Sequence, residues 1–195
     1  MSRKSSETRK RILDTAWKLL EAGQGKEVAM ADFAAAAKIS RQALYLHFPK
    51  RVDLLIATAR YVDEAHNIDD RLAASRNAPN GSARLEAYVL AWGNYIPEIY
   101  GIGKALLVLK ESDEAAAIAW NDRMQAVRHG CAAVVRELKA EGRLMDDYSV
   151  RQATDIMWTL LSVRNWEQFV LTCGWSQKRY IETLCEIIKQ SIVLK

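Results

Sequence analysis

Apolar residues return at every third or fourth position along almost the entire chain, and this periodicity constrains the fold more than any other feature of the sequence. A period near 3.6 residues is typical of an amphipathic helix, whereas a half-buried strand needs strict alternation. No segment alternates in that way, and no unit repeats along the chain. With 195 residues, half of them apolar, the chain can bury a sizeable core. The sequence therefore predicts an all-α fold.

The N-terminal quarter is predicted to hold three short helices followed by a longer one. Residues 7–21 place their apolar side chains on one broad helical stripe. Residues 30–37 are rich in alanine but only two turns long, so they need neighbours to be stable. Ser40 can cap a third helix, which Pro49 stops, and a longer helix begins at Arg51. Short helices on either side of a tight turn describe a helix-turn-helix unit.

The remainder of the chain is also predicted to be helical. Its clearest loop, residues 75–82, combines Asn, Pro, Gly and Ser. Helices are expected over residues 82–96, 103–113, 114–141 and 149–172, with a last helix after Ser176. Pro97 is expected to end the first of these helices, and Gly142 and Gly174 to close the third and fourth.

Positive charge is concentrated at the N-terminal end. Residues 1–55 carry 11 Lys and Arg against 6 Asp and Glu, a net +5, while the whole chain has +4 (28 against 24), so the other 140 residues sum to −1. Lys and Arg bind nucleic acid by displacing the counterions of its phosphates. The excess therefore indicates a phosphate-facing module, although a solvated basic arm is the alternative that charge alone leaves open.

Residues 34–55, AAAAKISRQALYLHFPKRVDLL, resemble the DNA-binding signature of the tetracycline-repressor (TetR) family of bacterial regulators. The resemblance rests on the alanine-rich helix, the short turn, the cap at Ser40, and the pattern Leu44, Tyr45, His47 and Phe48. It implies a helix-turn-helix DNA-binding domain over residues 1–55 and a larger helical ligand-binding and dimerisation domain over residues 56–195. It also implies a dimeric repressor that binds a palindromic operator and is released by a small molecule.

Position on the third helix and the resemblance together assign a set of residues to DNA. Arg41 and Gln42 lie in the first turn, where side chains reach base edges: Arg matches guanine and Gln matches adenine, each with two hydrogen bonds. The methyl group of Ala43 suits a thymine methyl, and the bare N–H groups behind Ser40 suit a phosphate. The full set of DNA-binding candidates is Ser40, Arg41, Gln42, Ala43, Tyr45, His47, Lys50 and Arg51, of which the last four are assigned to phosphates.

Three positions depart from the family pattern. Lys38 stands in the turn where the family usually has glycine, so a side chain must accept any left-handed backbone there. Ala29 stands where the second helix commonly begins with Thr or Ser. Arg51 stands where the family usually has Lys, which keeps the charge and adds a planar fork. None of the three removes a base-reading position.

The last two predicted helices are apolar on more than one face, so each must be covered on several sides. A four-helix bundle formed with the same helices of a second copy would cover them, and the resemblance implies the same homodimer. The interface residues we expect are Leu161, Leu184 and Ile188. The alternative is that both helices are simply central in a monomer.

Aromatic residues gather in the second part of the chain, where the family holds its effector cavity. Trp92 and Tyr95 lie three apart, hence on one helical face, and Trp158 lies on the long helix that such a cavity would abut. With Trp120 they form our candidate ligand site. The effector is expected to be mostly apolar or aromatic, and a cation is compatible because tryptophan faces attract positive charge. Each ring taken alone is more often part of the core than part of a pocket wall.

Several classes of protein do not fit the sequence. The three cysteines are odd in number and lack CxxC spacing, so neither a disulfide framework nor a zinc site is expected, and no cofactor or metal is predicted. We find no nucleophile with a base, carboxylate pair or ligand cluster, so the chain is not expected to be an enzyme. Without a membrane span or secretory signal, a cytoplasmic location is expected. The remaining alternative is an all-helical interaction module, or an enzyme, without specific DNA binding.

Overall fold

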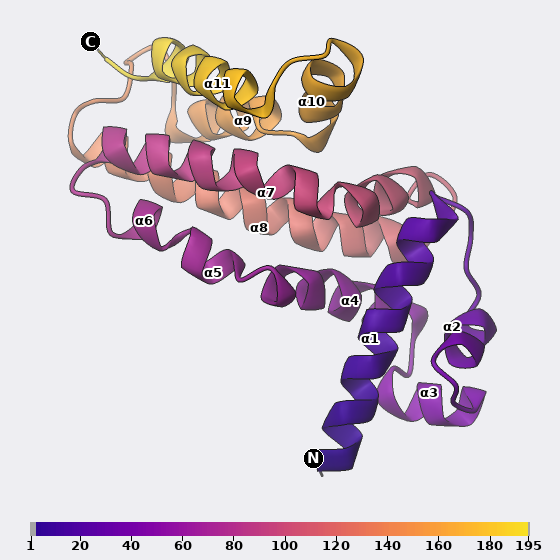
Figure 1. Ribbon diagram of the computed structural model, residues 1–195. Coiled ribbons are helices and arrows are strands. Elements are labelled where there is room, and N and C mark those ends of the chain that lie inside the picture. The colour runs from indigo at the N-terminus through magenta and orange to yellow at the C-terminus, as the bar shows by residue number, and fades with distance from the viewer. Residues whose placement is uncertain (1–2, 195) are drawn as a thin grey trace. The chain divides into compact units, whose positions relative to one another are not determined.

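The computed structural model describes residues 3–194, which form eleven α-helices and one π-helix (Figure 1). The only β-type contact among these residues is an isolated antiparallel bridge between Leu144 and Val193. The all-α prediction is confirmed. In chain order the helices are α1 (Arg3–Gly23), α2 (Met30–Ala36), α3 (Arg41–His47), α4 (Arg51–Ala65), α5 (Ile68–Arg71), α6 (Ala73–Arg76), α7 (Gly81–Leu109), α8 (Glu114–Ala140), α9 (Val150–Leu160), α10 (Val163–Trp166), the π-helix η1 (Glu167–Thr172) and α11 (Gln177–Ile192).

The chain packs into two compact units. The first unit contains the chain through His66 together with Ile99–Met124, and the second contains Asn67–Glu98 together with the chain from Gln125 onward. Helices α7 and α8 each contribute residues to both units. These units describe how the chain packs. The predicted boundary between residues 55 and 56 instead separates a DNA-binding domain from a ligand-binding and dimerisation domain. That boundary stays a prediction.

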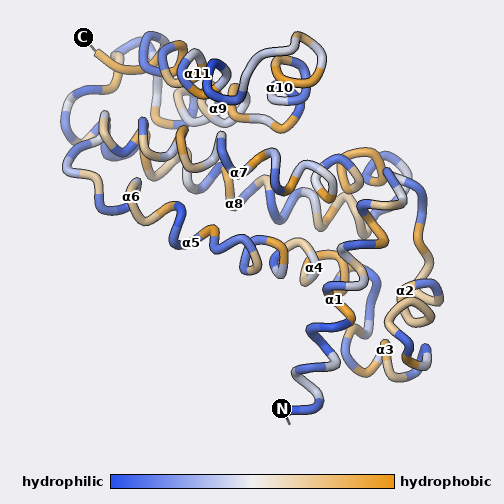
Figure 2. The backbone as a smooth tube through the Cα atoms, viewed as in Figure 1, coloured by the Kyte–Doolittle hydropathy of each residue, from blue (hydrophilic) through white to orange (hydrophobic). Residues whose placement is uncertain are grey.

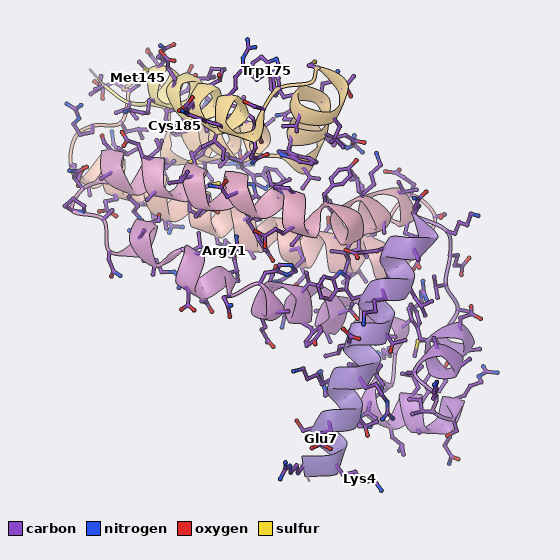
Figure 3. All side chains as sticks on the ribbon, in the orientation of Figure 1. Lys4, Glu7, Arg71, Met145, Trp175 and Cys185 are labelled. Atoms are coloured by element: carbon purple, nitrogen blue, oxygen red, sulfur yellow. The ribbon has the colours of Figure 1, made fainter. Side chains whose placement is uncertain are left out.

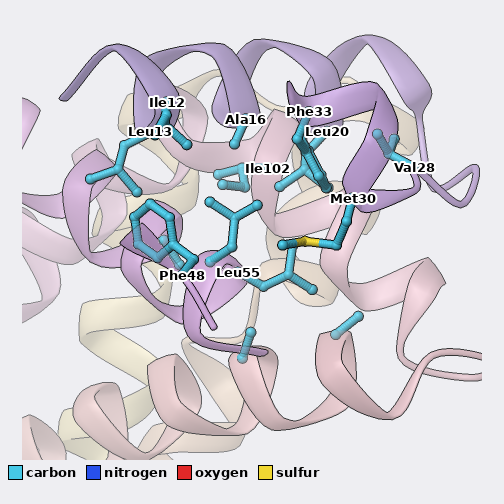
Figure 4. Packing of buried hydrophobic residues seen from close by; sticks show 14 of the residues in the cluster. Ile12, Leu13, Ala16, Leu20, Val28, Met30, Phe33, Phe48, Leu55 and Ile102 are labelled. Carbon is cyan, nitrogen blue, oxygen red and sulfur yellow. The ribbon is translucent and has the colours of Figure 1, made fainter. Parts of the chain in front are cut away.

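The first unit is built around the amphipathic α1. This helix packs against α4 and α2, and α2 packs against α3. Ile12, Ala16 and Leu20 on one stripe of α1 are at most 1% exposed and join Phe33 and Leu55 in one apolar cluster (Figure 4). Hydrophilic residues separate these apolar positions along the helix (Figure 2). Because burying one such side chain stabilises by roughly 1.5–3 kcal/mol, the cluster holds the short helices that could not stand alone.

Pro97 lies inside α7, so the prediction that a helix ends at this proline is wrong. A proline within a helix leaves the carbonyl four residues earlier without its hydrogen bond. That carbonyl belongs to Gly93, and the Nε2 amide of Gln177 donates to it at 2.6 Å. Gly93 also lets α11 approach, because a Cβ there would stand 2.6 Å from Cγ1 of Ile181. A distant helix thus replaces the hydrogen bond that the proline removes.

The prediction of one helix over residues 149–172 is also wrong, because α9 ends at Leu160 and the chain restarts as α10 and η1. Ser162 begins the new helix: its Oγ accepts a hydrogen bond from the N–H of Asn165 at 3.2 Å. The carbonyl of Leu161 accepts a hydrogen bond from Nε1 of Trp92 at 2.7 Å. A serine cap and a tertiary partner for the buried Leu161 carbonyl together stabilise the break.

The three predicted interface residues lie inside the second unit. Leu161 is 1% exposed, and Leu184 and Ile188 are fully buried within the single chain. They leave no surface for a second copy, so their assignment to a dimer interface is wrong. The periodicity correctly indicated which helix faces are apolar. The same periodicity results whether such a face is covered by α7 and α9 of the same chain or by a second copy.

Candidate nucleic-acid interface

The turn between α2 and α3 depends on a left-handed residue. Lys38 has φ +54°, a conformation that favours glycine because a Cβ is crowded there. Two hydrogen bonds hold it: the N–H of Ile39 donates to the carbonyl of Ala34, and the N–H of Lys38 donates to Ala35, both at 3.0 Å. This pair of bonds closes the C-terminus of α2. The chain therefore makes the turn with lysine where the family usually has glycine.

Side-chain caps begin the two short helices. Ser40 Oγ accepts a hydrogen bond from the N–H of Ala43 at 3.1 Å, as the sequence predicted for the start of α3. Ala29 has no polar side chain to cap α2, and the carboxylate of Asp32 instead accepts a hydrogen bond from the N–H of Ala29 at 2.9 Å. In a helix of seven residues each satisfied N–H is a large share of the local stabilisation.

Helix α3 turns one face inward and one outward. Leu44 and Phe48 are at most 1% exposed and hold the helix on the apolar cluster. The outward face carries Arg41 and Gln42, which are exposed, and Tyr45, which is 41% exposed. Of the other candidates, Ser40 and Lys50 are exposed, whereas Ala43 and His47 are half-buried. Apart from Arg51, the structure therefore gathers the predicted DNA-binding residues on and beside one accessible helix.

Two further side chains at this surface were missed by the sequence analysis. Leu46 in α3 is 81% exposed, and it follows Gln42 by four residues, so the two lie on one face. The sequence did contain a sign of this exposure: Leu46 lies two residues from both Leu44 and Phe48, so it cannot share their buried stripe. Arg9 of α1 stacks its guanidinium over the ring of Phe48, 4.7 Å from the centroid. That contact joins distant segments and leaves no local pattern.

Arg51 occupies a different environment from the other candidates. Its Nε and Nη2 donate to Oδ2 of Asp113 at 2.9 and 2.7 Å, and its Nη1 donates to the carbonyl of Val28. Its side chain is 19% exposed. Although burial alone would raise the pKa of the Asp113 carboxyl, hydrogen bonds from Arg51 and from backbone N–H groups at the start of α8 lower that pKa below its usual value.

The four aromatic ligand candidates do not share one compact unit. Trp120 belongs to the first unit and packs against its apolar cluster, whereas Trp92, Tyr95 and Trp158 belong to the second. Trp92 and Tyr95 meet edge to face with centroids 5.8 Å apart, and they are 6% and 1% exposed. Trp158 is half-buried in α9.

A cation already lies beside one of these rings. The guanidinium carbon of Arg71 (Figure 3) stands 5.7 Å from the centroid of Tyr95, within the range of a cation–π contact. Arg71 also donates two hydrogen bonds to the carboxylate of Glu98, at 2.8 and 2.7 Å. Both charged side chains are about one third exposed, at 32% and 38%.

The remaining polar chemistry of the described residues offers no second site. The three cysteines are free, and burial raises the pKa of the Cys131 thiol to about 12, so that thiol stays protonated near neutral pH. Residues 3–194 contain no group of three or more His, Cys, Asp or Glu arranged to hold a metal ion. Within the same range, every helix is too short or too polar to span a membrane.

A serine-capped reading helix that follows a tight turn on a compact helical core defines a helix-turn-helix protein. Residues 12–58 match the family of bacterial regulatory proteins described as the tetR family. The HTH-type transcriptional repressor LfrR of Mycolicibacterium smegmatis is 36% identical over 76 residues. That match spans 39% of this chain and 39% of the relative. The similarity to the TetR family therefore covers the helix-turn-helix and the helices that flank it.

Solved structures extend the likeness of the fold to nearly the whole chain. A putative transcriptional regulator from Saccharomonospora viridis, in complex with choline, has a TM-score of 0.74 and 21% identity, covering 97% of this chain and 100% of that chain. NalD, the secondary repressor of the MexAB-OprM multidrug efflux pump in Pseudomonas aeruginosa, has a TM-score of 0.69 and 18% identity, covering 98% of each chain. At these identities the likeness establishes the fold alone: an N-terminal helix-turn-helix domain followed by a larger helical domain.

Proposed function

We propose that the protein is a ligand-responsive transcriptional repressor that binds a palindromic DNA operator as a homodimer, and that it is not an enzyme. The observation that carries the proposal is the outward face of α3, where base-reading side chains are exposed while Leu44 and Phe48 hold the helix from behind. DNA is found in the reducing cytoplasm, which stays the predicted compartment and suits three free cysteines.

The geometry of α3 suits reading of the major groove. A groove about 12 Å wide accepts one helix, and side chains in its first turn reach the base edges. Arg41 supplies a donor fork for guanine and Gln42 a donor and acceptor for adenine. Tyr45, His47 and Lys50 follow on the later turn and the loop behind it, where they suit the flanking phosphates.

The first test is selection of bound fragments from random duplex DNA. A repressor enriches a palindromic sequence, whereas a helical interaction module or an enzyme without specific DNA binding enriches none. Arg41→Ala is then expected to cost roughly 1–3 kcal/mol and to relax specificity at one base pair per half-site. Lys50→Ala is the matched control: it should weaken all sequences alike and, because the dimer loses two phosphate contacts, reduce the salt slope by about 1.8. Equal losses on every sequence for both variants would contradict the assignment of Arg41 to bases.

The homodimer requires interface residues other than the buried ones named above. We propose Ile187 of α11, which is 37% exposed, and Leu171 of η1, which is 55% exposed, as contacts with a second copy. Ile187→Glu should then convert dimers into monomers in sedimentation, because symmetry brings the new charges together at the interface. Ile118→Glu in the first unit is the control, since Ile118 is 44% exposed and should not alter assembly. A micromolar monomer in the unaltered protein would refute the dimer.

For the effector we propose an organic cation bound at Tyr95 and Glu98 in the second unit. Tyr95 is buried, so the effector must replace a group already packed there, and the guanidinium of Arg71 is that group. A quaternary ammonium ion presents the same charge to the ring and the carboxylate. The choline in the structure from Saccharomonospora viridis makes choline a suitable first probe.

Choline should change the tryptophan emission of the protein, because Trp92 touches Tyr95, and it should change operator affinity in the same concentration range. Both effects should disappear in Glu98→Gln. They should persist in Glu111→Gln, because Glu111 is an exposed carboxylate in the first unit. A ligand can shift DNA binding only if it prefers one of the two states of the protein. Release of the operator by compounds that bind equally well to Glu98→Gln would place the effector elsewhere.

A further inference from the structure

The guanidinium of Arg51 is occupied on three sides by the protein itself. Two of its nitrogens donate to the same oxygen of Asp113, at 2.9 and 2.7 Å, and the third donates to the carbonyl of Val28. The guanidinium carbon also lies 5.8 Å from the ring centroid of Phe33. The Asp113 side chain is 11% exposed and that of Arg51 is 19% exposed. A phosphate would have to displace at least one of these partners to reach Arg51.

The same contacts join three segments of the first unit. Arg51 is the first residue of α4, Val28 lies between α1 and α2, and Asp113 immediately precedes α8. Asp113 is itself held, because its Oδ1 accepts hydrogen bonds from the N–H groups of Ala115 and Ala116 at 2.9 and 3.2 Å. The pair therefore ties the chain before α2 and the chain after α3 to one fixed helix end. Helix α3 lies between these two tied points in the sequence.

We propose that Arg51 is a positioning residue that sets the placement of α3 through Asp113 and Val28, rather than a ligand of DNA phosphate. The inference rests on the proposed function, since it concerns the reading of an operator. Arginine suits this role because its planar fork donates in several fixed directions at once, whereas an ammonium group is a single point of charge. The neighbouring Lys50, whose side chain is exposed, is the residue that this arrangement leaves for phosphate.

Operator affinity as a function of salt separates the two roles. We would measure it for Arg51→Lys, Asp113→Asn and the double variant, at a temperature where circular dichroism shows each protein fully folded. Each single variant should weaken binding about tenfold, and the double variant should be no weaker than either, because both changes break one contact. For all three variants, the slope of log affinity against log salt concentration should equal that of the unaltered protein. Lys50→Gln is the control and should lower the magnitude of that slope by about 1.8, since the dimer loses one phosphate contact in each half-site.

A phosphate ligand would behave in the opposite way. Arg51→Lys would then keep its affinity, and Asp113→Asn would tighten binding by releasing the guanidinium. Either result overturns the proposal, as does a double variant whose loss equals the product of the single losses. If the unaltered protein selects no duplex, the proposed function fails. The contact between Arg51 and Asp113 is then tested by denaturant unfolding of the same variants. Non-additive losses of stability would support the contact, and additive losses would overturn it.

Discussion

Leu46 is more exposed than any other large apolar side chain among residues 3–194, at 81%. A leucine in water forgoes the stabilisation that burial would give, so its place on the outward face of α3 has no structural reason within the single chain. On a helix lying in the major groove, an apolar side chain is suited to the C5 methyl group of thymine. We therefore predict that Leu46 adds an apolar contact to the polar reading that we propose for Arg41 and Gln42.

Replacing thymine with uracil in the selected operator tests this role directly, because uracil differs only by the missing methyl group. The unaltered protein should lose roughly 1 kcal/mol of binding at one position per half-site, within the range expected for one base contact. Leu46→Ala should bind both operators equally, and its stability should change by less than about 0.5 kcal/mol, since the side chain is exposed. An unchanged preference for thymine in Leu46→Ala would assign the methyl contact to another residue, with Ala43 the first candidate.

At the scale of elements, α7 shows how one helix depends on another. Pro97 removes the N–H that would bind the Gly93 carbonyl, and Gln177 at the start of α11 supplies a donor in its place. The same glutamine accepts a hydrogen bond from Nε1 of Trp166 at 2.8 Å. The side chain of Gln177 thus provides hydrogen-bond partners for two groups of the second unit that lie outside its own helix.

Gln177→Leu should destabilise the protein by roughly 1–3 kcal/mol, because it leaves the partly buried Gly93 carbonyl and the Trp166 indole without their partners. Part of this cost should vanish in a Pro97→Ala background, since alanine restores the N–H that binds the Gly93 carbonyl within α7. Denaturant unfolding of the four proteins in this cycle measures the coupling. Equal costs of Gln177→Leu in both backgrounds would show that the proline does not create the need for Gln177.

At the scale of the whole molecule, ion pairs hold the first unit together and make it sensitive to acid. Asp122 accepts hydrogen bonds from Arg60 and Arg123, and these lower the pKa of its carboxyl although burial opposes them. Arg123 also binds Asp63 at 2.6 Å, so α4 and α8 share a four-residue network. The stabilisation from a carboxyl with a lowered folded pKa is complete above its unfolded value, 3.8, and is lost as pH falls through the folded pKa.

Asp122→Asn should therefore lower the free energy of unfolding at pH 7 by about 1 kcal/mol, the upper end for partly exposed pairs. The difference from the unaltered protein should shrink as the pH falls below 3.8 and vanish below the folded pKa of Asp122, where the aspartate is protonated and is as uncharged as asparagine. Urea unfolding at a series of pH values measures it. A difference that stays constant throughout the acid range would mean that Asp122 contributes by packing and not by charge.

The sequence by itself determined the helical class, the helix-turn-helix and which face of α3 is buried. These follow from interactions within about four residues: the hydroxyl of Ser40 reaches Ala43, and Leu44 and Phe48 share one stripe because they lie one turn apart. Such local geometry is nearly independent of the rest of the chain. The family signature added the DNA-binding roles, which geometry alone would not assign.

Only the tertiary structure decided which partner each long-range group has. Arg51 binds an aspartate 62 residues away, the Gly93 carbonyl binds a glutamine 84 residues away, and Leu184 and Ile188 are covered by their own chain instead of a second copy. Periodicity shows that a face must be covered but does not identify what covers it. A charged or apolar side chain meets whichever group the packing brings near, and that choice is made by the whole fold.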